Sequence, residues 1–338
     1  MLLTSYTTLI ITGSALITFF ALLGLFLVYM ERKMAAFMQK RVGPMRVGPY
    51  GTVQTIADAL KLLGKEQFIP DGADRMLFRM APFMAVVACM LAFAPIPFSE
   101  ALQIWDINVG ALYIPAVMSL GAVAMITAGW ASNSKYPLLG AMRSGAQILS
   151  YELSLGFSLI AIVTFAGTLS LQEIVYSQSD GWWLFKGHIP AIIAFVIFII
   201  SATAELKRVP FDLAEAESEL TAGYHTEYSG MRFALFFLAE YVNIFIMSAL
   251  AATLFLGGWM PLQIGNWEAF NEIMAYIPPL LWFAIKTFLL VFLIMWFKWT
   301  FPRLRIDQLL KLEWKYLLPI SMANILLVAI ICLLGWHF

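Results

Sequence analysis

Charged residues and cysteines are scarce in this sequence of 338 residues. Asp, Glu, Lys and Arg together make up 12% of the chain, a proportion that excludes both an ordinary soluble domain and a disordered chain. The two cysteines, Cys89 and Cys332, lie in separate apolar runs. They provide neither a disulfide framework nor the ligand set of a zinc site or an iron–sulfur cluster. Any metal-based redox chemistry must therefore take place on another chain.

Apolar residues are abundant instead, at 61% of the sequence, and the mean hydropathy is +0.82. A membrane span needs roughly 20 mainly apolar residues. The apolar runs are continuous rather than alternating, which favours helices over barrel strands. The sequence therefore predicts an all-α protein, a single integral membrane domain with about eight transmembrane helices. The expected spans are 8–30, 78–98, 112–132, 147–168, 189–206, 231–257, 279–300 and 315–335.

Basic residues are distributed unevenly along the chain. All but Lys186 and Lys286 lie in or beside the connections that follow the first, third, fifth and seventh spans. Because basic loops mark the cytoplasmic side, we expect both termini on the non-cytoplasmic side of the cell inner (plasma) membrane. The N-terminus has no basic segment and no small-residue cleavage site, so the first run is expected to be a retained span.

The first connection contains two copies of a basic motif and a short amphipathic segment. Arg41-Val-Gly-Pro44 is repeated as Arg46-Val-Gly-Pro49, which predicts a structured, extended loop. Thr52 to Leu63 has apolar residues at helical spacing but is too short to span, so it is expected to lie along the membrane surface or against other helices. The charges at Asp58, and those of Glu31-Arg32-Lys33 where the first helix is expected to end, are equally explained as a wetted helix face and a charged stop.

An acidic stretch from Ser201 to Tyr241 holds a third of the 21 Asp and Glu residues. Pro210 is expected to end one helix and start another, on which Asp212, Glu215 and Glu219 share a face. Acids crowded in a partly dry site titrate as a coupled set, which suits proton storage and transfer. In a soluble protein the same run would be only a solvated face. The seven acids are Glu205, Asp212, Glu215, Glu217, Glu219, Glu227 and Glu240.

Isolated ionisable residues also fall inside expected spans, where they are costly unless paired or hydrated. Glu152 is expected about a turn into the fourth helix, and Arg143 could form a structural ion pair with it. Lys286 could pair with an acid. In the last basic loop, Asp307 could pair with Arg303 or a neighbouring arginine, in a solvated interface or a docking surface.

Several motifs resemble the membrane subunit of respiratory complex I (NADH-quinone oxidoreductase) that contacts quinone, known as the H subunit in bacteria and as the first subunit in mitochondria. The resemblance extends from Glu31 to about Pro319. Its two most specific segments are Gly51-Thr-Val-Gln-Thr-Ile-Ala-Asp58-Ala-Leu-Lys61 and Pro210-Phe-Asp-Leu-Ala-Glu-Ala-Glu-Ser-Glu-Leu-Thr-Ala-Gly223. Glu31-Arg-Lys33, Arg143-Ser-Gly-Ala-Gln-Ile-Leu-Ser-Tyr-Glu152 and Phe301-Pro-Arg303 support it.

The resemblance implies a subunit of a proton-translocating NADH:quinone oxidoreductase, without a complete active site of its own. Quinone would be the substrate, and electrons would come from an iron–sulfur cluster on a neighbouring subunit. Expected partners are peripheral-arm redox subunits on the basic loops, other membrane-arm pump subunits and lipid, with no nucleic acid. The implied proton-carrying residues are Glu152, Glu205, Asp212, Glu215, Glu217, Glu219, Glu227 and Glu240. The implied quinone-binding residues are Glu31, Arg32, Asp58, Arg143, Arg208, Phe211 and Tyr228.

Two other functions share part of this pattern. The membrane subunit of an energy-converting hydrogenase would have a similar acid network without needing quinone. An independent ion transporter would show internal repeats and helices broken at mid-membrane, and neither is clear here. The basic Gly-Pro repeat and the amphipathic segment favour the quinone-linked function.

Overall fold

The computed structural model describes residues 2–214, 217–263 and 268–335, and this part of the chain contains helices and no strands. Among the described residues, eight helices are long and apolar enough to cross a membrane, which confirms the predicted fold class. They are α1 (Leu2–Met38), α3 (Arg75–Phe93), α4 (Gly110–Ala131), α5 (Lys135–Ala166), α8 (His188–Glu205), α10 (Gly230–Phe255), α12 (Pro279–Thr300) and the continuous run of α13 (Ile306–Leu312), η3 (Glu313–Leu317) and α14 (Leu318–Leu333).

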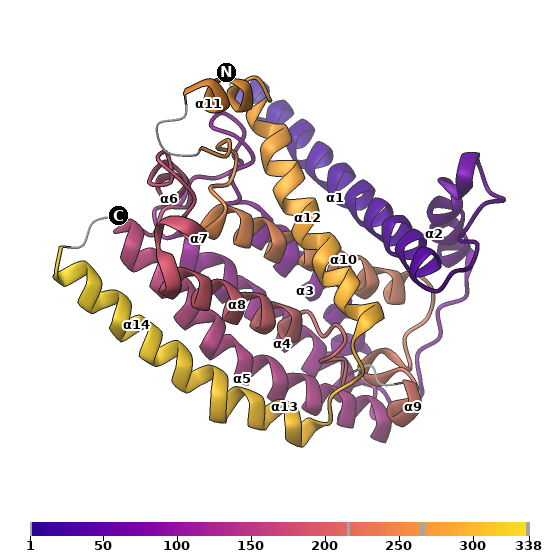
Figure 1. Cartoon of the computed structure of the whole chain (residues 1–338). Helices are drawn as coiled ribbons and strands as arrows, with labels where there is room; N and C mark the ends of the chain where they lie inside the picture. Colours follow the sequence, from indigo (N-terminus) through magenta and orange to yellow (C-terminus); the bar gives the residue numbers. More distant parts are fainter. Residues whose placement is uncertain (1, 215–216, 264–267, 336–338) are drawn as a thin grey trace.

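Shorter helices lie in the connections. They are η1 (Pro49–Gly51), α2 (Gln54–Gly64), α6 (Leu171–Tyr176), α7 (Trp183–Lys186), α9 (Glu217–Leu220), η2 (Gly223–His225) and α11 (Glu268–Ala275). The connections around α2, α9 and α13 gather at one end of the bundle, and we call this the basic end (Figure 1). The start of α1, the end of α14 and helices α6, α7 and α11 lie at the opposite end (Figure 1).

Several long helices extend beyond their apolar cores. Helix α1 continues through the expected stop at Glu31 to Met38, and α5 begins at Lys135, so most of the expected third loop is helical. The last helical run begins at Ile306 rather than near residue 315. Lys, Arg and Glu are good helix formers, so a helix can continue past the apolar region without a break.

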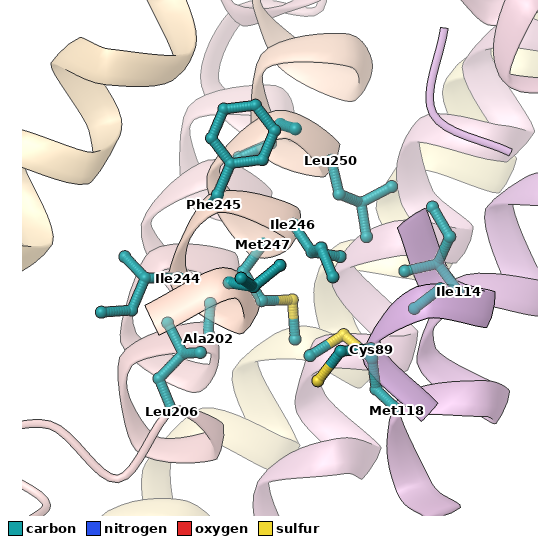
Figure 2. Packing of buried hydrophobic residues seen from close by; sticks show 14 of the residues in the cluster. Cys89, Ile114, Met118, Ala202, Leu206, Ile244, Phe245, Ile246, Met247 and Leu250 are labelled. Atoms are coloured by element: carbon teal, nitrogen blue, oxygen red, sulfur yellow. The ribbon is translucent and has the colours of Figure 1, made fainter. Parts of the chain in front are cut away.

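The main core lies around α10. In the most apolar 18-residue stretch of α8 and of α10, 61% of the residues are buried inside the protein. The corresponding share is 22% in α1 and in the last helical run. Figure 2 shows Cys89 of α3, Met118 of α4 and Met247 of α10 meeting in this core. The central helices therefore pack against protein, whereas most of the described side chains of α1 and of the last helical run are not buried inside it.

A second, smaller core lies at the basic end. It joins Tyr151 of α5, Ile197 of α8, Phe211 of the α8–α9 connection, and Leu309 and Leu317 of the last helical run. The aromatic rings of Tyr151 and Phe211 lie 5.4 Å apart. This core fixes the acidic connection against the long helices and surrounds several buried polar groups.

Candidate functional site

Glu31 lies at the centre of a buried cluster of charges at the basic end. Its carboxylate is 5% exposed and lies 3.2 Å from Arg208 Nη1, and Lys298 Nζ also donates a hydrogen bond to it. The Tyr241 side chain lies beside the same carboxylate, and the Arg208 guanidinium lies 4.7 Å from the centre of the Tyr241 ring. Helices α1, α10 and α12 and the α8–α9 connection thus meet at one ion cluster.

The next residue, Arg32, joins α1 to helix α2. Arg32 Nη1 forms an ion pair with Asp58 on α2, and Gln54 Nε2 donates a hydrogen bond of 3.1 Å to the other carboxylate oxygen. Glu31 and Arg32 therefore link two charge clusters through consecutive residues. Asp58 is not only the wetted side of α2, because its carboxylate ties α2 to α1.

The segment before α2 is compact and hydrogen-bonded. Lys33 Nζ donates a hydrogen bond of 2.8 Å to the carbonyl of Pro44, and the Val53 amide bonds the carbonyl of Val47. Gly51 has φ +78°, and a Cβ atom there would lie 2.1 Å from the Pro44 carbonyl oxygen. Only glycine fits this conformation and this close approach. On α2 itself and at its N-cap, Val53, Ile56, Leu60 and Leu63 are exposed.

Glu240 belongs to a second buried cluster between α10 and η2. Its Oε1 accepts a hydrogen bond of 2.7 Å from the Tyr224 hydroxyl and lies 3.8 Å from Lys207 Nζ. The Lys207 ammonium also lies 4.7 Å from the centre of the Tyr224 ring. His225 packs beside Tyr224 and Phe233, and burial lowers the pKa of its imidazole. Glu240 is therefore paired, as expected for a carboxylate inside a span.

Asp212 pairs with Arg303 across 3.0 Å, joining the α8–α9 connection to the segment after α12. Burial raises the pKa of the Asp212 carboxyl, and the Arg303 guanidinium opposes that shift. Arg303 is thus not the partner of Asp307, which lies in the first turn of α13.

The prediction that a helix starts at Pro210 and includes Asp212 is wrong. Asp212 lies in irregular chain, and the next helix, α9, begins only at Glu217. The Pro210 carbonyl accepts from the Leu304 amide, and the Phe211 carbonyl accepts from Gln147 Nε2 at 2.8 Å. These tertiary hydrogen bonds replace those that a helix would make.

Arg143 pairs with Glu219 at 2.6 Å rather than with Glu152. The Glu219 side chain is 56% exposed, so this pair is largely solvated. Gly140, one turn before Arg143, allows η2 to approach α5, because a Cβ atom at Gly140 would lie 2.9 Å from the Gly223 Cα. Glu215 and the Glu217 side chain lie outside the described residues.

Glu205 and Glu152 form a further group near the second core. Glu205 is 8% exposed, and its Oε2 has no hydrogen-bond partner among the described residues. The Glu152 carboxylate is near enough for the two charges to act on each other. Glu152 lies in the middle of α5 rather than a turn into it, and within the described chain it forms no ion pair. Glu227 is half-buried and likewise has no ionic partner in the described chain.

Tyr228 lies apart from the Glu31 cluster. Its ring stacks on Phe78 of α3, with the ring centres 4.0 Å apart, and burial raises the pKa of its hydroxyl. Ser229 beside it donates a hydrogen bond of 3.2 Å to the Glu66 carbonyl in the segment after α2. Tyr228 thus helps to hold the segment after α2 against α3 and α10. Phe211 in the same way holds the α8–α9 connection in the second core.

Lys286 does not pair with an acid in the described part of the chain. Its Nζ donates to the carbonyls of Leu256, Gly258 and Met260, the last at 2.6 Å. It also lies 4.5 Å from the centre of the Trp182 ring. These carbonyls follow the end of α10, where the helix itself leaves acceptors without donors. Lys286 is therefore a structural cap at the end opposite the Glu31 cluster.

Three charged residues that are buried or ion-paired in the structure are not evident as site residues from the sequence. Lys298 looks like the basic end of a span, and Lys207 like an ordinary loop cation. Glu313 falls in the basic last connection, yet it is fully buried in η3. Its position four residues from both Leu309 and Leu317, which places all three on one helix face, is the one sequence signal that indicates burial.

No group of three or more His, Cys, Asp or Glu side chains within the described ranges is arranged to hold a metal ion. One shallow apolar hollow lies on the outward face of α3 and is lined by Arg79, Met80, Phe83, Met84 and Val87. None of these residues belongs to the charge clusters. The distinctive chemistry of the structure is thus the set of paired and buried charges at the basic end.

Comparison with known proteins gives matches over nearly the whole chain. A sequence model of the family described as NADH dehydrogenase matches residues 11–329. The chain is 56% identical over 329 residues to the H subunit of NADH-quinone oxidoreductase from Bacteroides thetaiotaomicron, covering 97% of this chain and 92% of that protein. It is 50% identical over 323 residues to the protein of the same name in Bacillus mycoides, covering 94% of this chain and 93% of that protein.

Proposed function

The chain belongs to the family of the H subunit of NADH-quinone oxidoreductase, and from this premise we propose that it binds quinone and couples quinone reduction to proton translocation. The observation that carries the proposal is the junction at Glu31 and Arg32. There, a buried carboxylate bonded to Arg208 and Lys298 lies next to the ion pair between α1 and α2. Ionisable groups kept inside a membrane protein are functional candidates by default.

The quinone head group would meet the polar side chains of this junction. Arg32, Asp58 and Arg208 offer hydrogen-bond donors and an acceptor around Glu31, and α2 presents exposed apolar residues beside them. A quinone needs that combination, since its carbonyl oxygens accept hydrogen bonds and its tail is apolar. Phe211, Tyr228 and Arg143 do not belong to this junction. The proposed contribution of Phe211 and Tyr228 is to hold the surrounding segments in place.

Protons would move through the acids behind the junction. Glu240, Asp212 and Glu219 each pair with a cation, whereas Glu205 and Glu152 lie close together without an ion pair within the described chain. Reduction of quinone changes the charge at the head group and takes up protons. A change of charge near a set of coupled carboxylates shifts all of their proton affinities together.

The distribution of basic residues indicates how the subunit is oriented in the membrane. Because basic segments remain on the cytoplasmic side, the basic end would face the cytoplasm and both termini the other side. The redox subunits, which would carry the iron–sulfur clusters, would dock on the basic end, and the pump subunits would lie beside the outward helices in the membrane.

A photoreactive quinone analogue tests quinone binding directly. In the assembled complex, we expect light to attach the analogue to peptides that contain Glu31–Arg32 or Asp58, and excess unlabelled quinone to prevent it. Asp58→Asn should raise the KM for quinone, whereas Lys61→Gln, at an exposed cation on the same helix, should leave it unchanged. Labelling confined to other subunits, with an unchanged KM in Asp58→Asn, would contradict the proposal.

A further inference from the structure

Glu313 is a buried acid that the proposed quinone junction does not use. It begins η3, a single π-helical turn between α13 and α14, in which the Leu318 amide bonds the Glu313 carbonyl five residues earlier. Such wide turns inside α-helices are frequent at functional sites. The Glu313 residue is 0% exposed, although its neighbours Leu312 and Trp314 face outward in part.

The Glu313 carboxyl is connected by hydrogen bonds to two other helices. Ser154 Oγ of α5 lies 2.9 Å from Glu313 Oε2, and Ser201 Oγ of α8 lies 3.0 Å from Ser154 Oγ. All three side chains are fully buried. Glu205 lies four residues after Ser201, on the same face of α8.

The surroundings of Glu313 disfavour its ionised form. Leu309 and Leu317 lie one turn to either side, and Tyr151 lies near enough to be affected by its charge. No basic side chain lies within 4.0 Å of the Glu313 carboxylate in the part of the chain that the structure describes. A buried carboxylate without a cation costs several kcal/mol or more, so the neutral acid is favoured here.

A neutral carboxyl and two hydroxyls can pass a proton along their hydrogen bonds. Each of the three groups can both donate and accept. As the O–H bond of Glu313 breaks, an O–H bond forms on Ser154, which gives its own proton to Ser201. Ser201 and Glu205 share no hydrogen bond within the described residues, so the Glu205 carboxylate, one helical turn away, must turn toward Ser201 before it accepts that proton. The number of protons is then conserved. Glu205 Oε2 and Glu313 Oε1 have no hydrogen-bond partner among the described residues, which leaves each carboxyl an oxygen available for exchange.

We propose that Glu313 is an additional proton-holding residue of this subunit, and that it exchanges its proton with Glu205 through the hydroxyls of Ser154 and Ser201. The proposal rests on the proton coupling proposed above and extends it to the last helical run. Only Oε2 of Glu313 has a hydrogen-bond partner among the described residues, so no hydrogen bond there fixes Oε1.

Infrared difference spectroscopy of the assembled complex, triggered by quinone reduction, tests this proposal. It detects the C=O stretching band of carboxylic acids that change protonation or environment. We expect a band that is lost in Glu313→Gln and moves to higher frequency in Ser154→Ala, because the acid then loses a hydrogen bond. Ser158→Ala is the matched control, since the Ser158 hydroxyl bonds the Leu155 carbonyl and lies one turn farther along α5.

Proton translocation measured in the same preparations separates the two proposals. We expect fewer protons moved per electron in both Glu313→Gln and Glu205→Gln, with Glu272→Gln, at an exposed acid of α11, unchanged. A lower ratio in Glu205→Gln alone, with no band lost in Glu313→Gln, would overturn the role of Glu313 and leave the coupling function standing. An unchanged ratio in Glu205→Gln would refute the coupling function and, with it, exchange between the two acids. If Glu313→Gln does not assemble, the carboxylic acid band of Ser154→Ala tests the proposal instead. The absence of a shift in that band would overturn it.

Discussion

Arg208 Nη1 lies 3.2 Å from a carboxylate oxygen of Glu31, although 177 residues separate them in the chain. Both side chains are less than one-tenth exposed, and Lys298 reaches the same carboxylate from α12. Because two cations bind one buried acid, this cluster holds α1, α12 and the acidic connection together.

Replacing Glu31 should therefore weaken the protein markedly. Glu31→Gln keeps the size of the side chain but leaves Arg208 and Lys298 without their counter-charge. Breaking a buried pair by removing one member costs roughly 3–5 kcal/mol. We expect a clearly lower unfolding temperature of the assembled complex and slower quinone reduction. Glu66→Gln, at an exposed acid, should change neither, and equal stability of the two variants would show that the Glu31 cluster is dispensable.

Stability should also respond to pH through His225. Burial lowers the pKa of His225 below its usual value of 6.5, so the unfolded chain takes up a proton at a higher pH than the folded chain. Stability must then fall as the pH decreases from about 6.5 toward the lowered pKa. His225→Gln removes that contribution. The difference in unfolding temperature between this variant and the wild type should thus shift in favour of the variant on acidification. A difference that stays constant with pH would show that His225 titrates normally.

The ion pair of Arg143 should matter little to stability. Arg143 and Glu219 are 29% and 56% exposed, and exposed pairs are worth about 0–1 kcal/mol. Arg143→Ala should lower the unfolding temperature only slightly, to about the same extent as Lys135→Ala, at an exposed cation at the start of α5. A large loss in Arg143→Ala alone would indicate a buried partner for Arg143 in the assembled complex.

The eight long helices could be predicted because the membrane imposes a simple rule. Backbone groups in lipid must bond within their own helix, so each span must be a continuous apolar run of sufficient length. The helix ends were less predictable, since Lys135 and Arg143 extend α5 without any apolar signal.

The acidic connection shows where local pattern fails. The spacing of Asp212 and Glu219 indicates a shared helix face, but Gln147 and the Leu304 amide bind the carbonyls of Phe211 and Pro210 and hold the chain irregular. The two acids consequently pair with different arginines from different elements. Arg143 and Glu219, for example, are 76 residues apart in the chain. No periodic pattern in the sequence indicates ion pairs between such distant residues.

The charge clusters were predictable as a list of residue types and not as contacts. Glu31, Asp58 and Glu240 could be singled out because acids are scarce in an apolar chain. Their partners Lys298 and Lys207 could not, since a basic residue beside a span is ordinary. Glu313 could not be singled out either, because the hydropathy pattern places it in a basic connection. In the structure it is buried in a helix.

We infer that buried carboxylates of this subunit carry protons when quinone is reduced. The most direct measurement is the number of protons translocated per electron by the complex in sealed vesicles, with Glu205→Gln compared with Glu272→Gln. We expect a lower ratio for Glu205→Gln in an assembled, quinone-reducing complex, and no change for Glu272→Gln. An unchanged ratio in Glu205→Gln would contradict it.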